Sequence, residues 1–130
     1  VGADITAPQY WWQQFQRYHF ADIVSSQSKM HRVHRFNIGS QCNKWVSDDI
    51  VRIVNQYKDA YNENSNKENY MRLVSNLPMG FNLTARITTN YLQLKTIYHQ
   101  RKTHKLPEWQ HFCEWVRYLP HSDLFIKREG

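Results

Sequence analysis

Two stretches of this chain carry most of its arginine, lysine and histidine side chains, and these are the groups whose chemistry stands out. The first spans residues 17–35 and the second spans residues 72–105. Guanidinium groups bind phosphate through paired hydrogen bonds, and helix N-termini add backbone N–H donors. The pattern therefore predicts a site for an anionic ligand. The alternative interpretation of any single one of these side chains is a solvated basic surface.

Arg86 and Arg101 are the strongest phosphate-binding candidates because a regular element is expected to position each one. Apolar and polar residues alternate over residues 81–88, which predicts a half-buried strand with Arg86 on its polar face. Arg101 ends the apolar stripe of a helix. Asn90 is expected to cap the start of that helix, with Gln93 completing a capping box.

Other reactive side chains give weaker signals. His31 and His34 have the spacing of metal ligands on a helix, but no third ligand follows at a recognisable distance, so no metal site is predicted. His111 and Cys113 do not form a nucleophile pair, since helical positions two apart point away from each other. The chain also lacks the glycine-rich phosphate loops and the G-x-S-x-G motif.

Hydrophobic periodicity and capping signals predict a mostly helical α+β fold with four or five helices and a small sheet. Helices are expected over about residues 8–19, capped by Thr6 or Ala7, and over about 48–62, where Ser47 followed by Asp48 and Asp49 marks the start. A further helix is expected over about 67–76. Two more are expected over 90–101 and from Pro107 to before Pro120, with a short turn at Ser122. The inward face of the 48–62 helix is expected to carry Ile50, Ile53, Val54, Tyr57 and Tyr61. Residues 20–43 are predicted to be a long loop with a short strand.

The composition indicates one domain spanning residues 1–130 with an anionic partner. The chain has 41% hydrophobic residues and a net charge of +6. Its aromatic side chains are mostly expected in the core, with stacking on a ligand ring as the alternative for Tyr18 and Tyr98. Cys42 and Cys113 are expected to be reduced thiols in a cytoplasmic protein, the alternative being one disulfide. No window approaches the roughly 18 apolar residues of a membrane span.

The order of the motifs resembles the flavin-dependent thymidylate synthases (ThyX). In that family a glutamine-rich lead enters an R-H-R motif, followed by a serine and an N-E-x-S-x-R-Y run. Residues 14–19 read QFQRYH and residues 25–31 read SSQSKMH, which resemble these two segments with one residue inserted between them. The second half matches the family order better, through Arg72, Leu77-Pro78, Thr84 to Thr88, Asn90, Arg101 and Glu108.

The chain also departs from the family pattern. Tyr18 and His19 replace the second and third positions of the R-H-R motif, and Met30 replaces an arginine expected to hold the nucleotide phosphate. The strand-rich N-terminal portion of the family fold is expected to be largely absent. The resemblance implies a homotetramer that binds FAD and dUMP across subunit interfaces, with methylenetetrahydrofolate as carbon donor and a reduced nicotinamide as reductant. The departures imply that a nucleotide pocket can persist after the reaction is lost.

These observations lead to a primary hypothesis and two alternatives. The primary hypothesis is a nucleotide- or flavin-binding protein of reduced ThyX-like fold with a degraded catalytic motif, in a homo-oligomer. The alternatives are active FAD-dependent methylation of dUMP to dTMP, and a basic nucleic-acid-binding or inhibitory interaction protein. The small size would suit a phage-encoded protein.

The resemblance assigns roles to eight residues. Ser28 and Arg101 take the catalytic positions, and Arg17, His19 and Asn90 take the cofactor-binding positions. The phosphate- and ligand-binding positions fall on Gln27, Arg72, Arg86 and Arg101. Within this set, Arg86 and Arg101 are expected to hold phosphate, while Ser28 and Asn90 hydrogen-bond the base or sugar.

Overall fold

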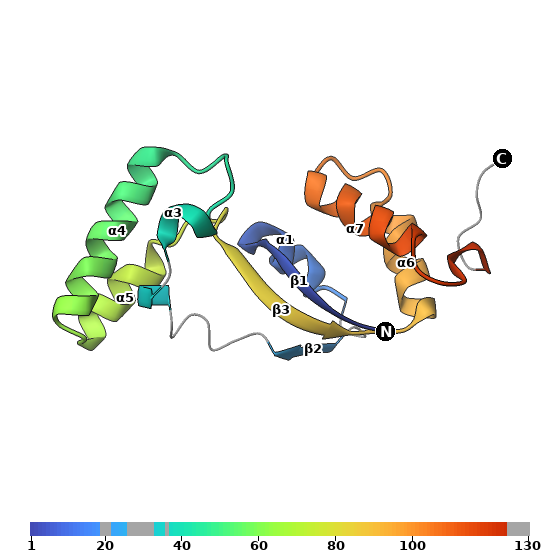
Figure 1. Ribbon diagram of the computed structural model, residues 1–130, viewed down its shortest axis with the longest axis horizontal. Coiled ribbons are helices and arrows are strands. Elements are labelled where there is room, and N and C mark those ends of the chain that lie inside the picture. The colour runs from blue at the N-terminus through green and yellow to red at the C-terminus, as the bar shows by residue number, and fades with distance from the viewer. Residues whose placement is uncertain (19–21, 26–32, 36, 125–130) are drawn as a thin grey trace.

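A three-stranded antiparallel sheet lies in the middle of the molecule, between two groups of helices (Figure 1). The computed structural model describes residues 1–18, 22–25, 33–35 and 37–124. Within these ranges the strands are β1 (Gly2–Pro8), β2 (Asp22–Ser25) and β3 (Asn82–Thr88). The helices are α1 (Gln9–Phe15), α3 (Ile38–Gln41), α4 (Asp48–Glu63), α5 (Lys67–Ser75), α6 (Tyr91–Arg101) and α7 (Pro107–Arg117), with short 3-10 turns η1 (Val33–Arg35) and η2 (Ser122–Leu124).

β3 is the central strand of the sheet. β1 pairs along one of its edges, from Gly2 opposite Thr88 to Pro8 opposite Asn82, and β2 pairs along the other edge. Because side chains alternate between the two faces of a strand, Ala85 and Ile87 are buried while their neighbour Arg86 is exposed. The predicted strand, with Arg86 on its polar face, is confirmed.

The larger hydrophobic core lies between the sheet and helices α1, α6 and α7. Aromatic rings dominate it: the ring of Trp11 lies 5.1 Å from that of Phe15 and 4.8 Å from that of Trp109, measured between centroids. Tyr18 and Tyr98 are 6% and 7% exposed and belong to the same core. These rings therefore fix the position of α1 against α7, on which the candidate site depends.

A smaller core packs α3, α4 and α5 against the beginning of β3, through Ile38, Val54, Leu73 and Phe81. The predicted inward face of α4 needs a correction, because Ile50 and Ile53 are each 43% exposed. Val51 packs against this core in their place. A shift of one position turns a side chain by about 100° around a helix, so a stripe centred on Val51 and Val54 leaves both isoleucines on the outer flank.

Side-chain caps begin four of the described helices, α3, α4, α5 and α6, as the sequence predicts for α4 and α6. Ser47 accepts a hydrogen bond from the backbone N–H of Asp49 at the start of α4. Asn90 and Gln93 form the predicted capping box at the start of α6. Asn66 caps α5 in the same way as Asn90 caps α6. These bonds satisfy N–H groups that have no partner inside the helix.

The N-terminal segment differs most from the prediction. Thr6 and Ala7 do not cap a helix, because both belong to β1, and α1 ends at Phe15, earlier than expected. The predicted loop over residues 20–43 contains the short helix α3 in addition to β2 and η1. The mostly helical α+β fold with a small sheet is confirmed. None of the helices in the described ranges has the length and apolar character of a membrane span.

Candidate functional site

Arg101, the last residue of α6, is held in a defined position by side chains from α1, the turn that follows α1, and α7. Its Nε donates to the hydroxyl of Tyr18 at 2.9 Å, and its Nη1 donates to Oε1 of Gln14 at 3.4 Å. The guanidinium carbon lies 4.6 Å from the centroid of the Trp109 ring. We call Gln14, Tyr18, Arg101 and Trp109 the Arg101 cluster. A cation over an aromatic face is stabilised electrostatically, which favours this orientation of the guanidinium group.

The partners of Arg101 are themselves fixed by hydrogen bonds. Nε1 of Trp109 donates to Oε1 of Gln14 at 2.6 Å, and the hydroxyl of Tyr18 donates to Oε1 of Gln100 at 2.8 Å. Gln14 therefore connects α1 to both α6 and α7. A binding group supported in this way by neighbouring hydrogen bonds is pre-organised for its ligand.

The charge of Arg101 is not neutralised by a carboxylate within the described residues. The ion pairs found there join Arg52 to Asp49, Arg72 to Glu68 and Arg86 to Asp4. The partners of Arg101 in the described ranges are neutral, and its Nη2 has no acceptor among them. Arg101 is half-buried, so this N–H group remains available for an anion.

Arg17 is the second predicted site residue near this cluster. It lies two residues after the end of α1, its side chain is exposed, and its backbone N–H donates to the carbonyl of Gln14 at 3.2 Å. His19, Gln27 and Ser28 lie outside the described residues.

The other three predicted site residues lie in different parts of the molecule. Arg86 is on the open face of the sheet, with Nη1 3.3 Å from Oδ1 of Asp4. Arg72 is on α5, at the opposite end of the molecule from α6 and α7 (Figure 1). Asn90 is at the start of α6, about 16 Å of helix away from Arg101. One copy of the chain therefore does not bring Arg72, Arg86 and Asn90 together with Arg101.

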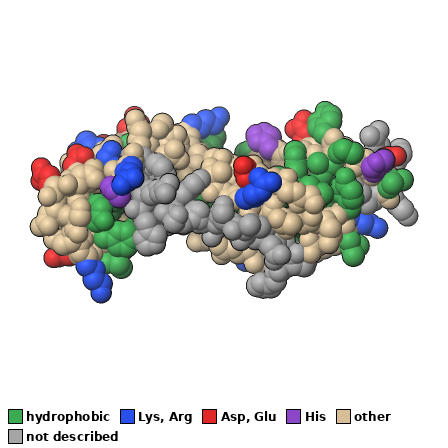
Figure 2. Space-filling model, turned by 60° about the horizontal axis from the view of Figure 1, so that its bottom comes forward, with side chains coloured by type: hydrophobic (Ala, Val, Ile, Leu, Met, Phe, Trp, Pro, Cys, Tyr) green, Lys and Arg blue, Asp and Glu red, His purple; other side chains and the backbone are tan. Residues whose placement is uncertain are grey.

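The basic side chains are also dispersed on the surface. Figure 2 turns the underside of Figure 1 forward and shows blue and red groups side by side near the middle, with further blue groups spread along the length of that face. In the described part of the chain, no group of three or more His, Cys, Asp or Glu side chains is placed to hold a metal ion.

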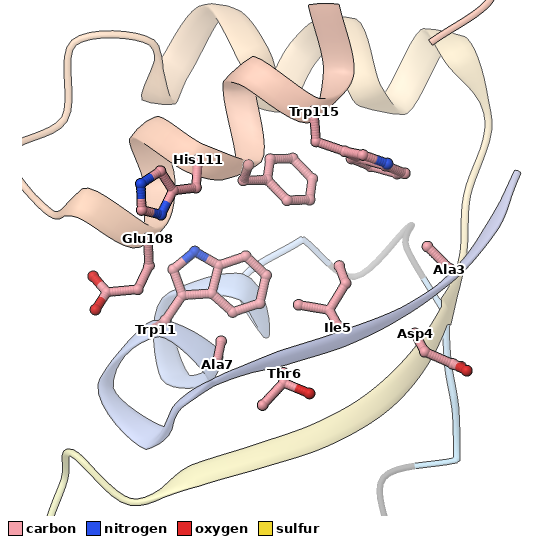
Figure 3. A pocket seen from close by; sticks show the side chains of 10 residues that line it. Ala3, Asp4, Ile5, Thr6, Ala7, Trp11, Glu108, His111 and Trp115 are labelled. Atoms are coloured by element: carbon pink, nitrogen blue, oxygen red, sulfur yellow. The ribbon is translucent and has the colours of Figure 1, made fainter. Parts of the chain in front are cut away.

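A pocket that sequence reasoning missed lies between β1 and α7 (Figure 3). At one end of it the hydroxyl of Tyr10 donates to Oε1 of Glu108, and Nδ2 of Asn43 donates to the same hydroxyl at 3.2 Å. Burial, followed by the neighbouring Glu108 carboxylate, raises the pKa of Tyr10 to about 12. Tyr10 is therefore a stable hydrogen-bond donor near neutral pH. The contact between Tyr10 and Glu108 has no signal in the sequence, because 98 positions separate the two residues.

Comparison with solved structures identifies the fold. Two crystal structures of ThyX, the flavin-dependent thymidylate synthase of Helicobacter pylori, each in complex with FAD and dUMP, are similar to this chain, with TM-scores of 0.69 and 0.67. The chain has a ThyX-like fold. Both alignments cover 95% of this chain and 70% of the ThyX chain, at 16% sequence identity. No protein-family model and no curated protein matches the sequence.

The ThyX-like fold agrees with the motif order in the sequence. The N-terminal region contains a strand that the sequence analysis did not expect, because β1 pairs with the central strand over its full length. At 16% identity the similarity concerns the arrangement of the backbone, so the roles of individual side chains must be argued from their own surroundings.

Proposed function

We propose that this protein binds the phosphate of a nucleotide or flavin through Arg101 and that its catalytic motif is degraded. The observation that carries the proposal is the Arg101 cluster, which orients a guanidinium group and leaves its Nη2 without a described partner. Arginine is well suited to phosphate because its planar donor groups match two phosphate oxygens. The solved structures that resemble this chain contain FAD and dUMP, which supports this ligand class.

The position of Tyr18 supports a loss of the reaction. In the resemblance to the ThyX family, Tyr18 stands where the histidine of the R-H-R motif belongs. Its side chain is only 6% exposed, and its hydroxyl is bonded to Arg101 and Gln100. A buried side chain whose hydroxyl makes these hydrogen bonds positions its neighbours and is not accessible to a cofactor. Under this proposal, a core side chain occupies the position of the motif histidine in this chain.

The complete site requires a second copy of the chain under this proposal. Arg72 and Arg101 lie at opposite ends of the molecule, so they can face one ligand only across an interface (Figure 1). Asn90 is also separated from Arg101 by the length of α6, and Arg86 lies on the open face of the sheet. We therefore propose a homo-oligomer, a tetramer by family resemblance, in which residues of the predicted set from different copies line one site.

Chemical analysis of the purified protein tests this function. Small molecules released on denaturation would be identified by mass spectrometry, and the oligomeric state would be measured by light scattering. We expect a bound nucleotide or flavin and a particle larger than one chain. Oxidation of a reduced nicotinamide that depends on added dUMP would instead show that catalysis persists. Binding of nucleic acid with steep salt dependence, and no affinity for mononucleotides or flavins, would overturn the proposal.

A further inference from the structure

The outer edge of β1 has no strand partner in the described part of the chain. β1 pairs with β3 along its inner edge, and β2 lies on the far side of β3. The backbone nitrogen and oxygen of Val1 both bond to Thr89, at 2.7 and 2.9 Å. Hydrogen-bonded and non-hydrogen-bonded pairs alternate along an antiparallel ladder. The odd-numbered residues of β1 therefore bond to β3, and the even-numbered residues direct their backbone groups outward.

The outward backbone groups of β1 belong to Gly2, Asp4 and Thr6. All three residues are exposed, so a partner can reach their N–H and carbonyl groups. Pro8 takes the next outward position but has no N–H group, and the row of donors ends at Thr6. An exposed strand edge of this kind is a template for pairing with another extended segment.

The pocket between β1 and α7 runs along the same edge (Figure 3). Its volume is about 300 Å³, and it touches every residue of β1 from Ala3 to Ala7. Successive side chains of a strand point to opposite faces, so a cavity that touches consecutive residues lies beside the strand. Because β3 occupies the inner edge, this cavity is a groove along the outer edge, where an added strand would lie.

α7 forms the opposite wall of the groove. Its lining residues recur at the spacing of one helical face: Glu108, His111, Phe112 and Trp115. Trp115 is half-buried, as are Ala3 and Ile5 on the side of β1 that faces the core. The apolar surface of the groove is thus incompletely covered. Apolar side chains of an added strand that point toward α7 would complete its burial.

Among the described residues, the charged side chains that line the groove are both acidic, Asp4 and Glu108, although the chain has a net charge of +6. Asp4 lies on the open face of the sheet, 3.3 Å from Arg86, and both side chains are more than half exposed. Such an exposed ion pair is weak, so Asp4 can accept a second cation. A lysine or arginine directly opposite Asp4 on an added strand would form a cross-strand ion pair.

We infer that the outer edge of β1 binds an extended peptide segment as an additional antiparallel strand. The peptide backbone bonds to Gly2, Asp4 and Thr6, a basic side chain faces Asp4, and the alternate apolar side chains enter the groove beside α7. None of the four residues of the Arg101 cluster lines the groove. The peptide site is therefore separate from the proposed phosphate site.

The space beside α7 favours a single segment over a second copy of the chain. Two copies joined through β1 in antiparallel fashion are related by a two-fold axis perpendicular to the joined sheet, so both α7 helices lie on the same face. Each α7 faces its own β1 across the groove, and the two helices would compete for the space above the joined strands (Figure 3). A peptide brings no helix and meets one α7 alone.

The probe is the synthetic peptide acetyl-KVTIKLT-amide, designed so that its second lysine lies opposite Asp4 in an antiparallel strand. Calorimetry would measure its binding to the full chain. N-methylation of its third, fifth and seventh residues removes the N–H groups that face β1 and should weaken binding at least about a hundredfold. N-methylation of the second, fourth and sixth residues, whose N–H groups point away, should change affinity less than about threefold. Absence of binding by the unmodified peptide, or any other pattern of the two methylated forms, would overturn the inference.

Hydrogen exchange followed by NMR locates the peptide on the strand. In the free chain, the amide protons of Ile5 and Ala7 should be protected, and those of Asp4 and Thr6 should exchange rapidly. Saturating peptide should slow exchange at Asp4 and Thr6 at least about tenfold. Protection of these two amides in the free chain would show that a second copy or another segment already covers the edge, and the inference would be wrong.

A pair of variants at Thr6 tests the outward N–H group. Thr6→Pro removes this group and leaves the bonds to β3 intact, so it should weaken peptide binding about tenfold or more. Thr6→Val keeps the N–H group and loses the hydroxyl contact with Thr84. It should bind the peptide within about twofold of the unmodified chain. Equal affinity of the two variants would contradict pairing along this edge.

A charge reversal keeps the test decisive if circular dichroism shows that Thr6→Pro does not fold. Asp4→Lys changes an exposed side chain and should weaken binding of acetyl-KVTIKLT-amide about fivefold. It should instead favour the peptide in which glutamate replaces the second lysine. Asp59→Lys, an exposed residue of α4, is the matched change of charge and should leave both affinities unchanged. If Asp4→Lys behaves like Asp59→Lys, the peptide does not lie against β1 as inferred.

Discussion

Oε1 of Gln14 lies 2.6 Å from Nε1 of Trp109, although 95 positions separate the two residues in the chain. The same oxygen is 3.4 Å from Nη1 of Arg101. Oε1 of Gln14 therefore accepts hydrogen bonds from two donors. Trp109 belongs to the buried core, and Arg101 belongs to the proposed phosphate site. Stability and ligand binding are linked at this side chain.

The first prediction concerns Gln14 itself. Gln14→Leu leaves the buried N–H of Trp109 without an acceptor and should lower the free energy of unfolding by about 1–3 kcal/mol. Gln14→Glu keeps an acceptor and should retain most of the stability. Urea unfolding measures both, with the exposed Gln13→Leu as the control. Equal stability of the two leucine variants would mean that this hydrogen bond does not hold the cluster together.

The second prediction separates capping from ligand binding at Asn90. Asn90→Ala removes the capping box of α6 and should cost about 1 kcal/mol of unfolding free energy. Asn90→Asp retains a capping oxygen and should cost less. Asn66→Ala, at the start of α5, is the matched loss of a cap. If Asn90 also contacts the ligand, Asn90→Asp should weaken binding of a nucleotide or flavin, whereas Asn66→Ala should not.

Local signals in the sequence predicted much of this fold. The capping box at Asn90, the cap at Ser47 and the alternation that places Arg86 on the open face each depend on residues within a few positions. β1 was not predictable in this way, because its stability comes from pairing with β3, some eighty positions later. Pro8, the last residue of β1, also gave a helix signal, because proline is common in the first turn of a helix.

The third prediction concerns thiol reactivity. Burial raises the pKa of Cys113 to about 11, although Arg117 and Arg101 act in the opposite direction. Because this pKa lies well above the ordinary 9.0, the thiolate fraction of Cys113 at pH 8 is about a hundredfold lower than that of an ordinary cysteine. Alkylation of Cys113 should therefore be at least about a hundredfold slower in the folded protein than in urea. Burial also raises the pKa of Cys42, which is only half-buried and should react at an intermediate rate.

Timed labelling with iodoacetamide and mass spectrometry would follow each thiol. Cys42→Ser isolates the signal of Cys113, and Cys113→Ser isolates that of Cys42. Rapid labelling of Cys113 in the folded state would show that its thiol is accessible, in conflict with its buried position.

The fourth prediction follows from the pKa of Tyr10, which is raised from 10.0 to about 12 by burial and by Glu108. A raised pKa means that the folded state holds the proton more tightly than the unfolded state. The resulting stabilisation is complete below pH 10 and is lost as the pH rises toward 12. The free energy of unfolding should therefore fall more steeply above pH 10 in the unmodified chain than in Tyr10→Phe.

Urea unfolding between pH 9 and about pH 11 measures this slope. Tyr118→Phe is the control, because the Tyr118 side chain is 81% exposed. Its slope should match that of the unmodified chain. If the slopes of Tyr10→Phe and the unmodified chain coincide, Tyr10 does not donate to Glu108 in solution.

The candidate sites were less predictable than the fold. The sequence singled out Arg101 because it ends an apolar helical stripe, but the Tyr18 and Trp109 side chains that hold it come from distant segments. The pocket beside Glu108 depends on Tyr10 and Trp11, which read only as core aromatics. Contacts between distant segments form only when the chain folds, so spacing along the sequence carries no signal for them.

Calorimetric titration of dUMP and of FAD tests the proposed role of Arg101 most directly. The unmodified chain would be compared with Arg101→Gln and with Arg117→Gln, a control whose guanidinium carbon also lies over an aromatic ring, that of Tyr98. Loss of a charged hydrogen bond should weaken binding of the preferred ligand about tenfold to a hundredfold in Arg101→Gln. Arg117→Gln should bind that ligand as the unmodified chain does. Absence of binding to the unmodified chain, or equal affinity in all three proteins, would contradict the proposed function.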